Sequence, residues 1–224
     1  MGRKIHPYGF RVGVTKDWQS RWYAPHTTYA EFTIQDQKLR DFLNKELSEA
    51  GVSKLHIERQ AASTAVTIYT SKPGIVIGRQ GANIEQLRNA LQLQVGTRVN
   101  VNVEEIRVPE LDAYLVAKSV AMSLERRVAF RRAMKQSVQR TMSRGAVGCK
   151  VKISGRLGGA EMSRSEHEMQ GRIPLHTIRA DIDYGFAEAN TSFGAIGVKC
   201  WVNKGEVTHA DNPLVRAAEQ TGGE

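Results

Sequence analysis

Apolar and polar residues alternate with a period of two in several segments of the first half of the chain. The segments 64–70 and 97–104 follow this pattern, which is typical of half-buried strands. Leu55 and Ile57 indicate a third strand. Together these segments predict a three-stranded sheet.

Helical spacing marks the segments before and between these strands. Apolar residues within 39–47 predict an amphipathic helix that Gly51 would end. A second helix is predicted after residue 81 by apolar residues spaced i, i+3 and i+7, namely Ile84, Leu87 and Leu91.

The second half of the chain begins with helical patterns and continues with strands. Helices are predicted at 111–127 and 128–144, after a domain junction near 106–110. The period then changes to two in three apolar rows: Cys149, Val151 and Ile153; Ile178, Ala180, Ile182 and Tyr184; Ile196, Val198, Cys200 and Val202. Two helices on a sheet form an α+β domain, and α+β is the fold class that we predict for the chain.

A Gly-x-x-Gly loop lies between an apolar run and the helix after residue 81. Two glycines around two polar residues allow another polymer's backbone to approach closely. The order of predicted elements is that of a type II KH domain, in which such a loop clamps the backbone of about four nucleotides. We therefore predict RNA contacts at Gly78, Arg79, Gln80 and Gly81, the alternative being a turn that only links two helices.

The composition favours a polyanionic partner. Lys and Arg number 32 against 23 Asp and Glu, which gives a net charge of +9 over 224 residues. Such a surplus favours nucleic acid first and an anionic membrane second. No apolar stretch approaches the roughly 18 residues that span a bilayer, so no membrane partner is expected. Cys149 and Cys200 are predicted to be buried thiols rather than a disulfide.

The positive charge is concentrated between residues 118 and 144. Eight cations face a single acid, Glu125, in this segment: Lys118, Arg126, Arg127, Arg131, Arg132, Lys135, Arg140 and Arg144. On a helical wheel, an apolar stripe of Phe130, Met134 and Val138 lies away from three cations, Arg131, Arg132 and Lys135. An anionic partner would relieve the repulsion among these cations, whereas a solvated basic face is the alternative.

The first 22 residues form a second basic region. Cations are interleaved with aromatic residues here: Arg3, Lys4, Arg11, Lys16 and Arg21 with Tyr8, Phe10, Trp18 and Trp22. Glycines and a proline argue against a regular helix. An irregular arm of this composition suits RNA, where rings stack on bases and cations meet phosphates. Alternatively, the aromatic side chains anchor the arm to the protein's own core.

The sequence gives little support for catalysis. No Gly-x-x-x-x-Gly-Lys-Ser/Thr loop occurs, and two isolated cysteines cannot form a Cys-rich zinc site. Asp181 and Asp183 lie two apart on a predicted strand, the minimum for a metal-dependent nuclease, although paired acids on a solvated strand are far commoner. We expect no catalytic residue, no metal and no cofactor, and therefore not an enzyme.

Several separated motifs resemble the bacterial small-subunit ribosomal protein S-three family. The matching segments run from Gly2 to Arg11, from Lys16 to Tyr23, from Pro73 to Gly81, from Leu124 to Lys135, from Ser154 to Glu161 and from Pro174 to Tyr184. The chain differs from many relatives in carrying neutral Gln80 where a second loop cation is common, so a weaker grip on phosphate is expected there.

The resemblance implies a structural protein in the head of the cytoplasmic small ribosomal subunit. It implies binding to the 3′ major domain of the small-subunit (16S) rRNA, contact with proteins S-ten and S-fourteen, and a place near S-four and S-five at the channel through which mRNA enters. Arg131, Arg132 and Lys135 would face the incoming mRNA. We assign rRNA binding to the cations of the arm, the basic segment and the glycine-rich turn: Arg3, Lys4, Arg11, Arg21, Arg126, Arg127 and Arg156.

These observations predict four parts of the chain. They are a basic aromatic arm at 1–22, a type II KH domain at 23–108, an α+β ribosomal domain at 109–206 and a disordered tail at 207–224. A free KH-domain RNA regulator that acts off the ribosome is the alternative function, and an RNA-processing enzyme that uses the two aspartates is a more distant third.

Overall fold

The computed structural model describes residues 4–60 and 63–207. The chain forms two compact units, one of residues 18–107 and one that combines the residues up to Asp17 with those from Val108 onward. The chain passes from one unit to the other between Asp17 and Trp18 and returns between Arg107 and Val108. The predicted tail lies outside the described residues except for Val207.

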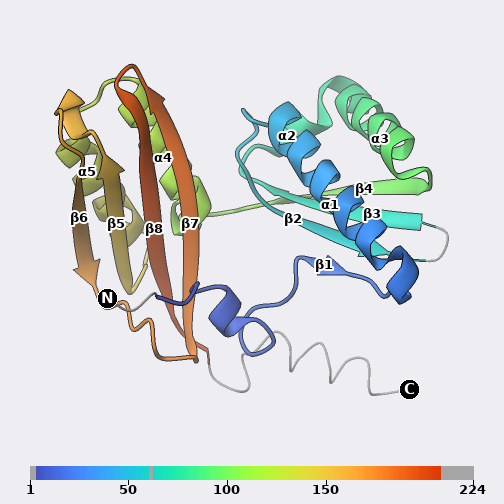
Figure 1. The fold of residues 1–224 in the computed structure, drawn as a ribbon, viewed down its shortest axis with the longest axis horizontal. Helices are drawn as coiled ribbons and strands as arrows, with labels where there is room; N and C mark the ends of the chain where they lie inside the picture. The colour runs from blue at the N-terminus through green and yellow to red at the C-terminus, as the bar shows by residue number, and fades with distance from the viewer. Residues whose placement is uncertain (1–3, 61–62, 208–224) are drawn as a thin grey trace. The chain divides into compact units, whose positions relative to one another are not determined.

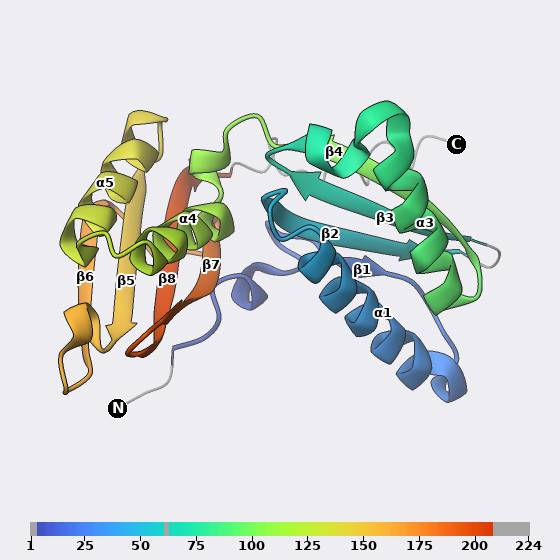
Figure 2. The same cartoon turned by 90° about the horizontal axis from the view of Figure 1, so that it is seen from above.

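The unit of residues 18–107 is a four-stranded sheet covered by helices on one face (Figures 1 and 2). In spatial order the strands are β1 (Ser20–Arg21), β2 (Val52–Arg59), β3 (Ser63–Thr70) and β4 (Arg98–Glu105). β2 and β3 are antiparallel, whereas β1 runs parallel to β2 and β4 runs parallel to β3. The three strands predicted from alternation are therefore present, and a two-residue strand extends the sheet.

The helices of this unit bury their apolar faces in one core. They are α1 (His26–Glu46), α2 (Pro73–Ile77) and α3 (Ala82–Val95). Leu39 and Leu43 of α1 join Leu91 of α3 and Ile57 and Val66 of the sheet. This burial explains why the spacing of apolar residues predicts α3 and the second half of α1.

The first half of α1 is held by a buried polar group rather than by an apolar stripe. Asp36 is buried, and its carboxylate accepts bonds from Arg59 at 2.6 and 2.9 Å and from Trp22 Nε1 at 2.8 Å. The ring of Trp22 also lies 5.1 Å from that of Tyr29. This part of the predicted arm therefore anchors to the protein, as the alternative interpretation expected.

The second unit places two helices on one face of an antiparallel sheet (Figures 1 and 2). The helices are α4 (Ala113–Glu125) and α5 (Phe130–Ser143), and the strands are β5 (Gly148–Gly155), β6 (Arg164–Gly171), β7 (Ala180–Thr191) and β8 (Gly194–Glu206). The spatial order is β6-β5-β8-β7. Short 3₁₀ turns complete the two units at Gly9–Arg11, Arg79–Gly81, Pro109–Leu111 and Leu157–Gly159. The predicted α+β fold class is confirmed.

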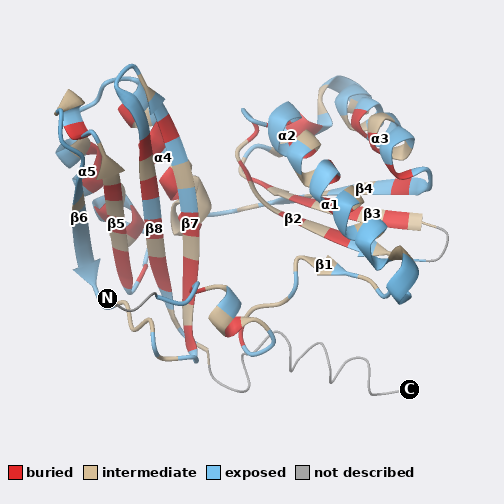
Figure 3. Cartoon of the chain, in the orientation of Figure 1, coloured by how far each residue is buried: buried red, intermediate tan, exposed pale blue. Residues whose placement is uncertain are grey.

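Burial alternates along three strands of this sheet but not along the fourth (Figure 3). Val151, Val198 and Cys200 point into the core beneath α4 and α5, and both cysteines are free, buried thiols. β6 contains no buried residue. Because alternation is the signal of a half-buried strand, β6 could not be predicted from it.

Close backbone contact fixes α4 on β7. A Cβ at Gly185 would lie 2.3 Å from the carbonyl oxygen of Ala113, so only glycine allows this approach. Asp112 caps the helix by accepting bonds from the N–H groups of Tyr114 and Leu115 at 3.0 and 3.1 Å. The carboxylate of Asp183 accepts a further bond from Ala113 N at 3.3 Å.

The N-terminal segment packs against this second unit through Arg11. Arg11 is 0% exposed. Its guanidinium donates to five backbone carbonyls: Nε to Ala180 at 2.8 Å, Nη1 to Pro7 at 3.0 Å, and Nη2 to Pro174, Leu175 and Thr177 at 3.5, 3.1 and 2.9 Å. Burial lowers the pKa of this guanidinium, and Asp181 opposes that effect. The prediction that Arg11 contacts rRNA is contradicted, because no part of its side chain is available to a phosphate.

None of the helices in the described part of the chain combines the length and hydrophobicity that crossing a membrane requires. In the same residues, no group of three or more His, Cys, Asp or Glu side chains could hold a metal ion.

We predict that Arg11→Ala destabilises the second unit by about 3 kcal/mol, because it leaves two buried and three partly buried carbonyls without this donor. Arg11→Lys should recover little, since an ammonium has fewer donors and no planar fork. Native-state hydrogen exchange of the β7 and β8 amides would measure the loss in this unit alone.

The control is Arg179→Ala in the same unit, which removes an exposed ion pair with Glu206 at 2.7 Å. An exposed pair contributes about 0–1 kcal/mol. Equal effects of Arg11→Ala and Arg179→Ala would contradict a structural role for Arg11.

Candidate RNA interface

The Gly-x-x-Gly loop connects α2 to α3 with its two central side chains exposed. Gly78 has φ +72° and Gly81 has φ +81°, so both glycines occupy backbone conformations that other residues rarely adopt. A Cβ at Gly78 would lie 2.5 Å from Cγ of Asn83, whose amide donates to the carbonyl of Ile75 at 3.2 Å. Position 78 therefore requires glycine for two reasons: a Cβ would collide with Asn83, and the positive φ disfavours other residues.

Gln80 also has a positive φ, at +52°. For a residue with a Cβ, this left-handed conformation costs about 1–2 kcal/mol. The loop consequently presents the exposed side chains of Arg79 and Gln80 on a backbone that three residues hold at positive φ.

The predicted cations of α5 lie on its exposed face. Met134 and Val138 are buried in the core, and Phe130 packs against it, which confirms the apolar stripe. Arg131, Arg132 and Lys135 are all exposed. The buried stripe fixes the rotation of the helix, so these three side chains point away from the sheet.

One acid of β6 restrains two arginines beside this face. Glu166 accepts bonds from Arg131 Nε at 3.3 Å and from Arg164 Nε at 3.0 Å. The two guanidinium groups also lie 5.6 and 5.7 Å from the centre of the Phe130 ring. These hydrogen bonds, that of Arg131 first, lower the pKa of Glu166, so the carboxylate stays ionised.

Acids outside the basic segment neutralise part of its positive charge, which the count of residues within the segment does not show. Arg131 pairs with Glu166, and Arg144 lies 3.7 Å from Glu110. Burial lowers the pKa of Lys118. Within residues 4–60 and 63–207, Arg132 and Lys135 form no ion pair, and Arg131 is still 76% exposed.

The remaining predicted rRNA contacts fall into separate groups. Lys4 is exposed, Arg21 lies on β1 at 3.8 Å from Glu58, and Arg3 lies outside the described residues. Arg126 and Arg127 are exposed where α4 ends.

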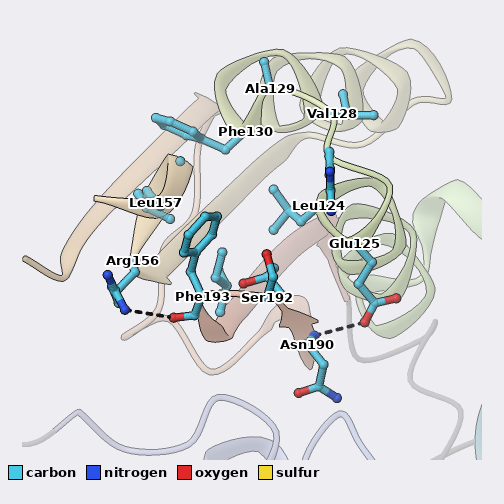
Figure 4. A pocket seen from close by; sticks show the side chains of 15 residues that line it. Leu124, Glu125, Val128, Ala129, Phe130, Arg156, Leu157, Asn190, Ser192 and Phe193 are labelled. Carbon is cyan, nitrogen blue, oxygen red and sulfur yellow. Dashed lines mark hydrogen bonds between the residues drawn. The ribbon is translucent and has the colours of Figure 1, made fainter. Parts of the chain in front are cut away.

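Arg127 and Arg156 line one hollow in the second unit (Figure 4). The hollow has a volume of about 440 Å³. Arg156 is exposed and donates from Nε to Ala160 O at 3.0 Å and from Nη1 to Phe193 O at 3.4 Å. Residues far apart in the sequence thus meet at one place on the surface.

Both aspartates considered as a minimal nuclease pair are engaged by other groups of the second unit. Asp181 pairs with Lys16. Asp183 is buried and holds the first turn of α4 through Ala113 N, with Lys204 Nζ 3.7 Å away. Both carboxylates are therefore structural.

Sequence reasoning missed Arg164 and Phe193 as neighbours of the predicted cations. Arg164 lies on β6, for which the sequence gives no alternation, and Phe193 lies at the tip of the β7–β8 hairpin. No local signal pairs either residue with α5 or with Arg156, because the contacts depend on strand order and register.

Comparison with known proteins covers most of the chain. A family model for the KH domain matches residues 38–111, and one for ribosomal protein S3, C-terminal domain, matches residues 120–202. A small ribosomal subunit protein uS3 of Desulfitobacterium hafniense is 54% identical over 223 residues, with 100% of each chain covered. Proteins of the same name from Dichelobacter nodosus and Xanthomonas campestris pv. campestris are 57% and 55% identical, covering 92% of this chain and 86% and 85% of theirs.

The chain belongs to the uS3 family. The KH match contains the Gly-x-x-Gly loop, and the C-terminal match contains α5 and Arg156. The uS3 family consists of ribosomal structural proteins, which confirms that the chain is not an enzyme.

We predict that Gly78→Ala destabilises the KH unit more than Gly81→Ala, by roughly 1–2 kcal/mol. Both changes introduce strain at positive φ. Only the first displaces Asn83, since a Cβ at Gly81 would find its nearest neighbour at 3.8 Å. Urea unfolding of the full chain, followed through the KH amides by hydrogen exchange, would measure the difference. Equal losses would show that the contact with Asn83 relaxes freely.

We also predict that Glu166→Gln strengthens binding of single-stranded RNA several-fold, because it releases Arg131 and Arg164 toward phosphate. The salt dependence should steepen by up to about 0.7 per added contact. Because the pKa of Glu166 is lowered, the wild-type chain should show this gain only below the usual titration range of glutamate.

The matched control is Glu206→Gln, which frees Arg179 elsewhere in the same unit. Fluorescence anisotropy with labelled oligouridylate at several salt concentrations would compare the two variants. A gain that is equal in both would reflect net charge rather than the site.

Proposed function

We propose that the chain guides mRNA into the small ribosomal subunit with the exposed cations of α5 and holds rRNA with its KH loop and with exposed arginines. Membership in the uS3 family makes it a structural, RNA-binding protein of that subunit. The finer assignment to a channel for incoming mRNA is the proposal.

The observation that carries this proposal is the exposed row of Arg131, Arg132 and Lys135 on α5. Met134 and Val138 fix the opposite face of the helix in the core. Cations held in this way attract phosphate without reading bases, which suits a strand whose sequence is arbitrary. Arginine can also bond two phosphate oxygens at once.

The KH loop supports the second part of the proposal. Gly78, Gly81 and Gln80 hold the loop at positive φ, and Arg79 is exposed at its centre. With a single cation, the loop would hold a backbone largely by close approach. We assign it to rRNA, together with Lys4, Arg21, Arg126, Arg127 and Arg156, and with Arg3 outside the described residues.

The neighbours are proposed on the family resemblance alone. They are proteins S-ten and S-fourteen in the head, with S-four and S-five near the channel through which mRNA enters, in the cytoplasm. A free KH regulator that acts off the ribosome is not favoured, because a matched relative that covers the whole chain is named as a small ribosomal subunit protein.

We predict that combining Arg131→Ala, Arg132→Ala and Lys135→Ala weakens mRNA binding by purified small subunits but leaves assembly intact. Losing three direct phosphate contacts on a single strand should flatten the log-log salt dependence by roughly 2. Filter binding of an unstructured mRNA to reconstituted subunits would measure both the affinity and the slope.

The control has the same charge change on three exposed residues of the same unit, Arg140→Ala, Arg172→Ala and Lys199→Ala. If this control flattens the slope equally, the effect is one of net charge. If the first triple variant fails to enter subunits, the division between message binding and assembly is wrong.

A further inference from the structure

Three connections of the second unit enclose the hollow that Figure 4 shows. They are the segment between α4 and α5, the 3₁₀ turn Leu157–Gly159 after β5, and the hairpin between β7 and β8. All of them belong to the same compact unit, so the shape of the hollow does not depend on the KH unit.

The lining combines an apolar base with an aromatic ring at the surface. Leu124, Leu157 and Ile196 are buried residues of the lining. Phe193 is 55% exposed, and in Figure 4 its side chain lies between those of Leu157 and Ser192. A flat heterocycle could cover both the apolar base and this ring, because every nucleobase has a face that stacks on an aromatic side chain.

Cationic groups at the hollow retain donors for a ligand. Arg156 uses Nε and Nη1 for backbone carbonyls, and among the described residues its Nη2 has no hydrogen-bond partner. This arrangement holds the guanidinium in place, 5.9 Å from the centre of the Phe193 ring. Its remaining N–H groups are left to meet an anion.

The acid in the lining is already engaged. Glu125 Oε1 accepts a bond from the backbone N–H of Asn190 at 3.0 Å, which draws the carboxylate to the hairpin (Figure 4). Arg127 forms no ion pair with any described residue. The charges therefore favour an anionic ligand.

The backbone of Arg127 supplies an independent observation. Its φ is +61°, and it occupies the position after a helix where glycine is usual. The bonds Arg127 N to Leu124 O at 2.9 Å and Val128 N to Ser123 O at 3.0 Å define this helix end. Glycine would fit without strain, so the fold alone does not call for an arginine.

We propose that this hollow seats one unstacked nucleotide of the small-subunit rRNA. The base would lie on Phe193 over the apolar base of the hollow, and Arg127 and Arg156 would hold its phosphates. The inference rests on the proposed function, since it takes the RNA-facing role of this unit as given.

We propose rRNA rather than mRNA as the ligand because mRNA moves through the subunit during translation, whereas rRNA stays in place. Stacking of one base on an aromatic side chain is substantial, and a message that advances by codons would have to break it repeatedly. A nucleotide in a fixed strand remains seated. The cations of α5 instead lie on an exposed helix face, which suits the moving strand.

Photocrosslinking in assembled small subunits tests the site directly. A photoreactive phenylalanine analogue replaces Phe193, Met162 or Arg131 in turn, Met162 being an exposed residue of the same unit that does not line the hollow. We expect position 193 to link to one defined rRNA nucleotide and position 162 not to link to that nucleotide.

Links from position 193 to protein only, to mRNA, or to nothing would overturn the nucleotide site. Links from position 131 to RNA with none from 193 would remove the hollow alone and leave the proposed function standing. If neither position links to RNA, the proposed function fails as well.

Two pairs of variants separate binding from folding. Phe193→Ala should weaken binding of the full chain to a transcript of the 3′ major domain by about 5–100-fold, whereas Phe193→Tyr, which keeps the ring, should bind like the wild type. Unchanged binding by Phe193→Ala would overturn the proposal.

Arg127→Gly should raise the melting temperature by roughly 2–4 °C while weakening binding to the same transcript about tenfold. Arg127→Ala should weaken binding equally without the thermal gain, because it keeps a Cβ at positive φ. A higher melting temperature with unchanged binding would show that Arg127 has no part in the site.

Discussion

The buried guanidinium of Arg11 joins parts of the chain that are more than 160 residues apart. It bonds the carbonyl of Ala180, where β7 begins, and the carbonyls of the preceding loop. β7 in turn holds α4, through the close approach at Gly185 and the bond from Ala113 to Asp183. The end of α4 carries Arg126 and Arg127. The part of the RNA surface that we assign to Arg126 and Arg127 therefore depends on a buried cation, Arg11, whose own donors are used by backbone carbonyls.

Each unit packs one face of its sheet into a core, and the described cations that we assign to RNA lie outside that core. In α5 the burial of Met134 and Val138 directs Arg131, Arg132 and Lys135 to solvent. Glu166 then decides how far Arg131 is available, because the carboxylate and an RNA phosphate compete for the same guanidinium. The affinity of the basic face for RNA therefore depends on Glu166 as well as on the number of cations.

The sequence predicts those parts of the fold that depend on local periodicity. Alternation at 64–70 and helical spacing through Met134 and Val138 both report which side chains are buried, and burial is what the structure shows. β6 cannot be predicted in this way, because it has no buried residues and therefore no alternation of apolar and polar positions. RNA contact is predicted for Arg11 because cations interleaved with aromatic residues on an irregular arm are typical of RNA binding. Its actual partners are carbonyls from a distant loop, which no local pattern can reveal.

Backbone strain distinguishes the surfaces further. In the part of the chain that the structure describes, Gln80 and Arg127 are the residues other than glycine with a positive φ. Both lie at places assigned to rRNA, one in the KH loop and one beside the hollow. The cations of α5, assigned to mRNA, are on a regular helix. A fixed ligand can compensate for a strained backbone in the assembled state, because it binds once and remains. A moving strand gives no such lasting compensation, so an unstrained helix with exposed cations is the arrangement that suits it.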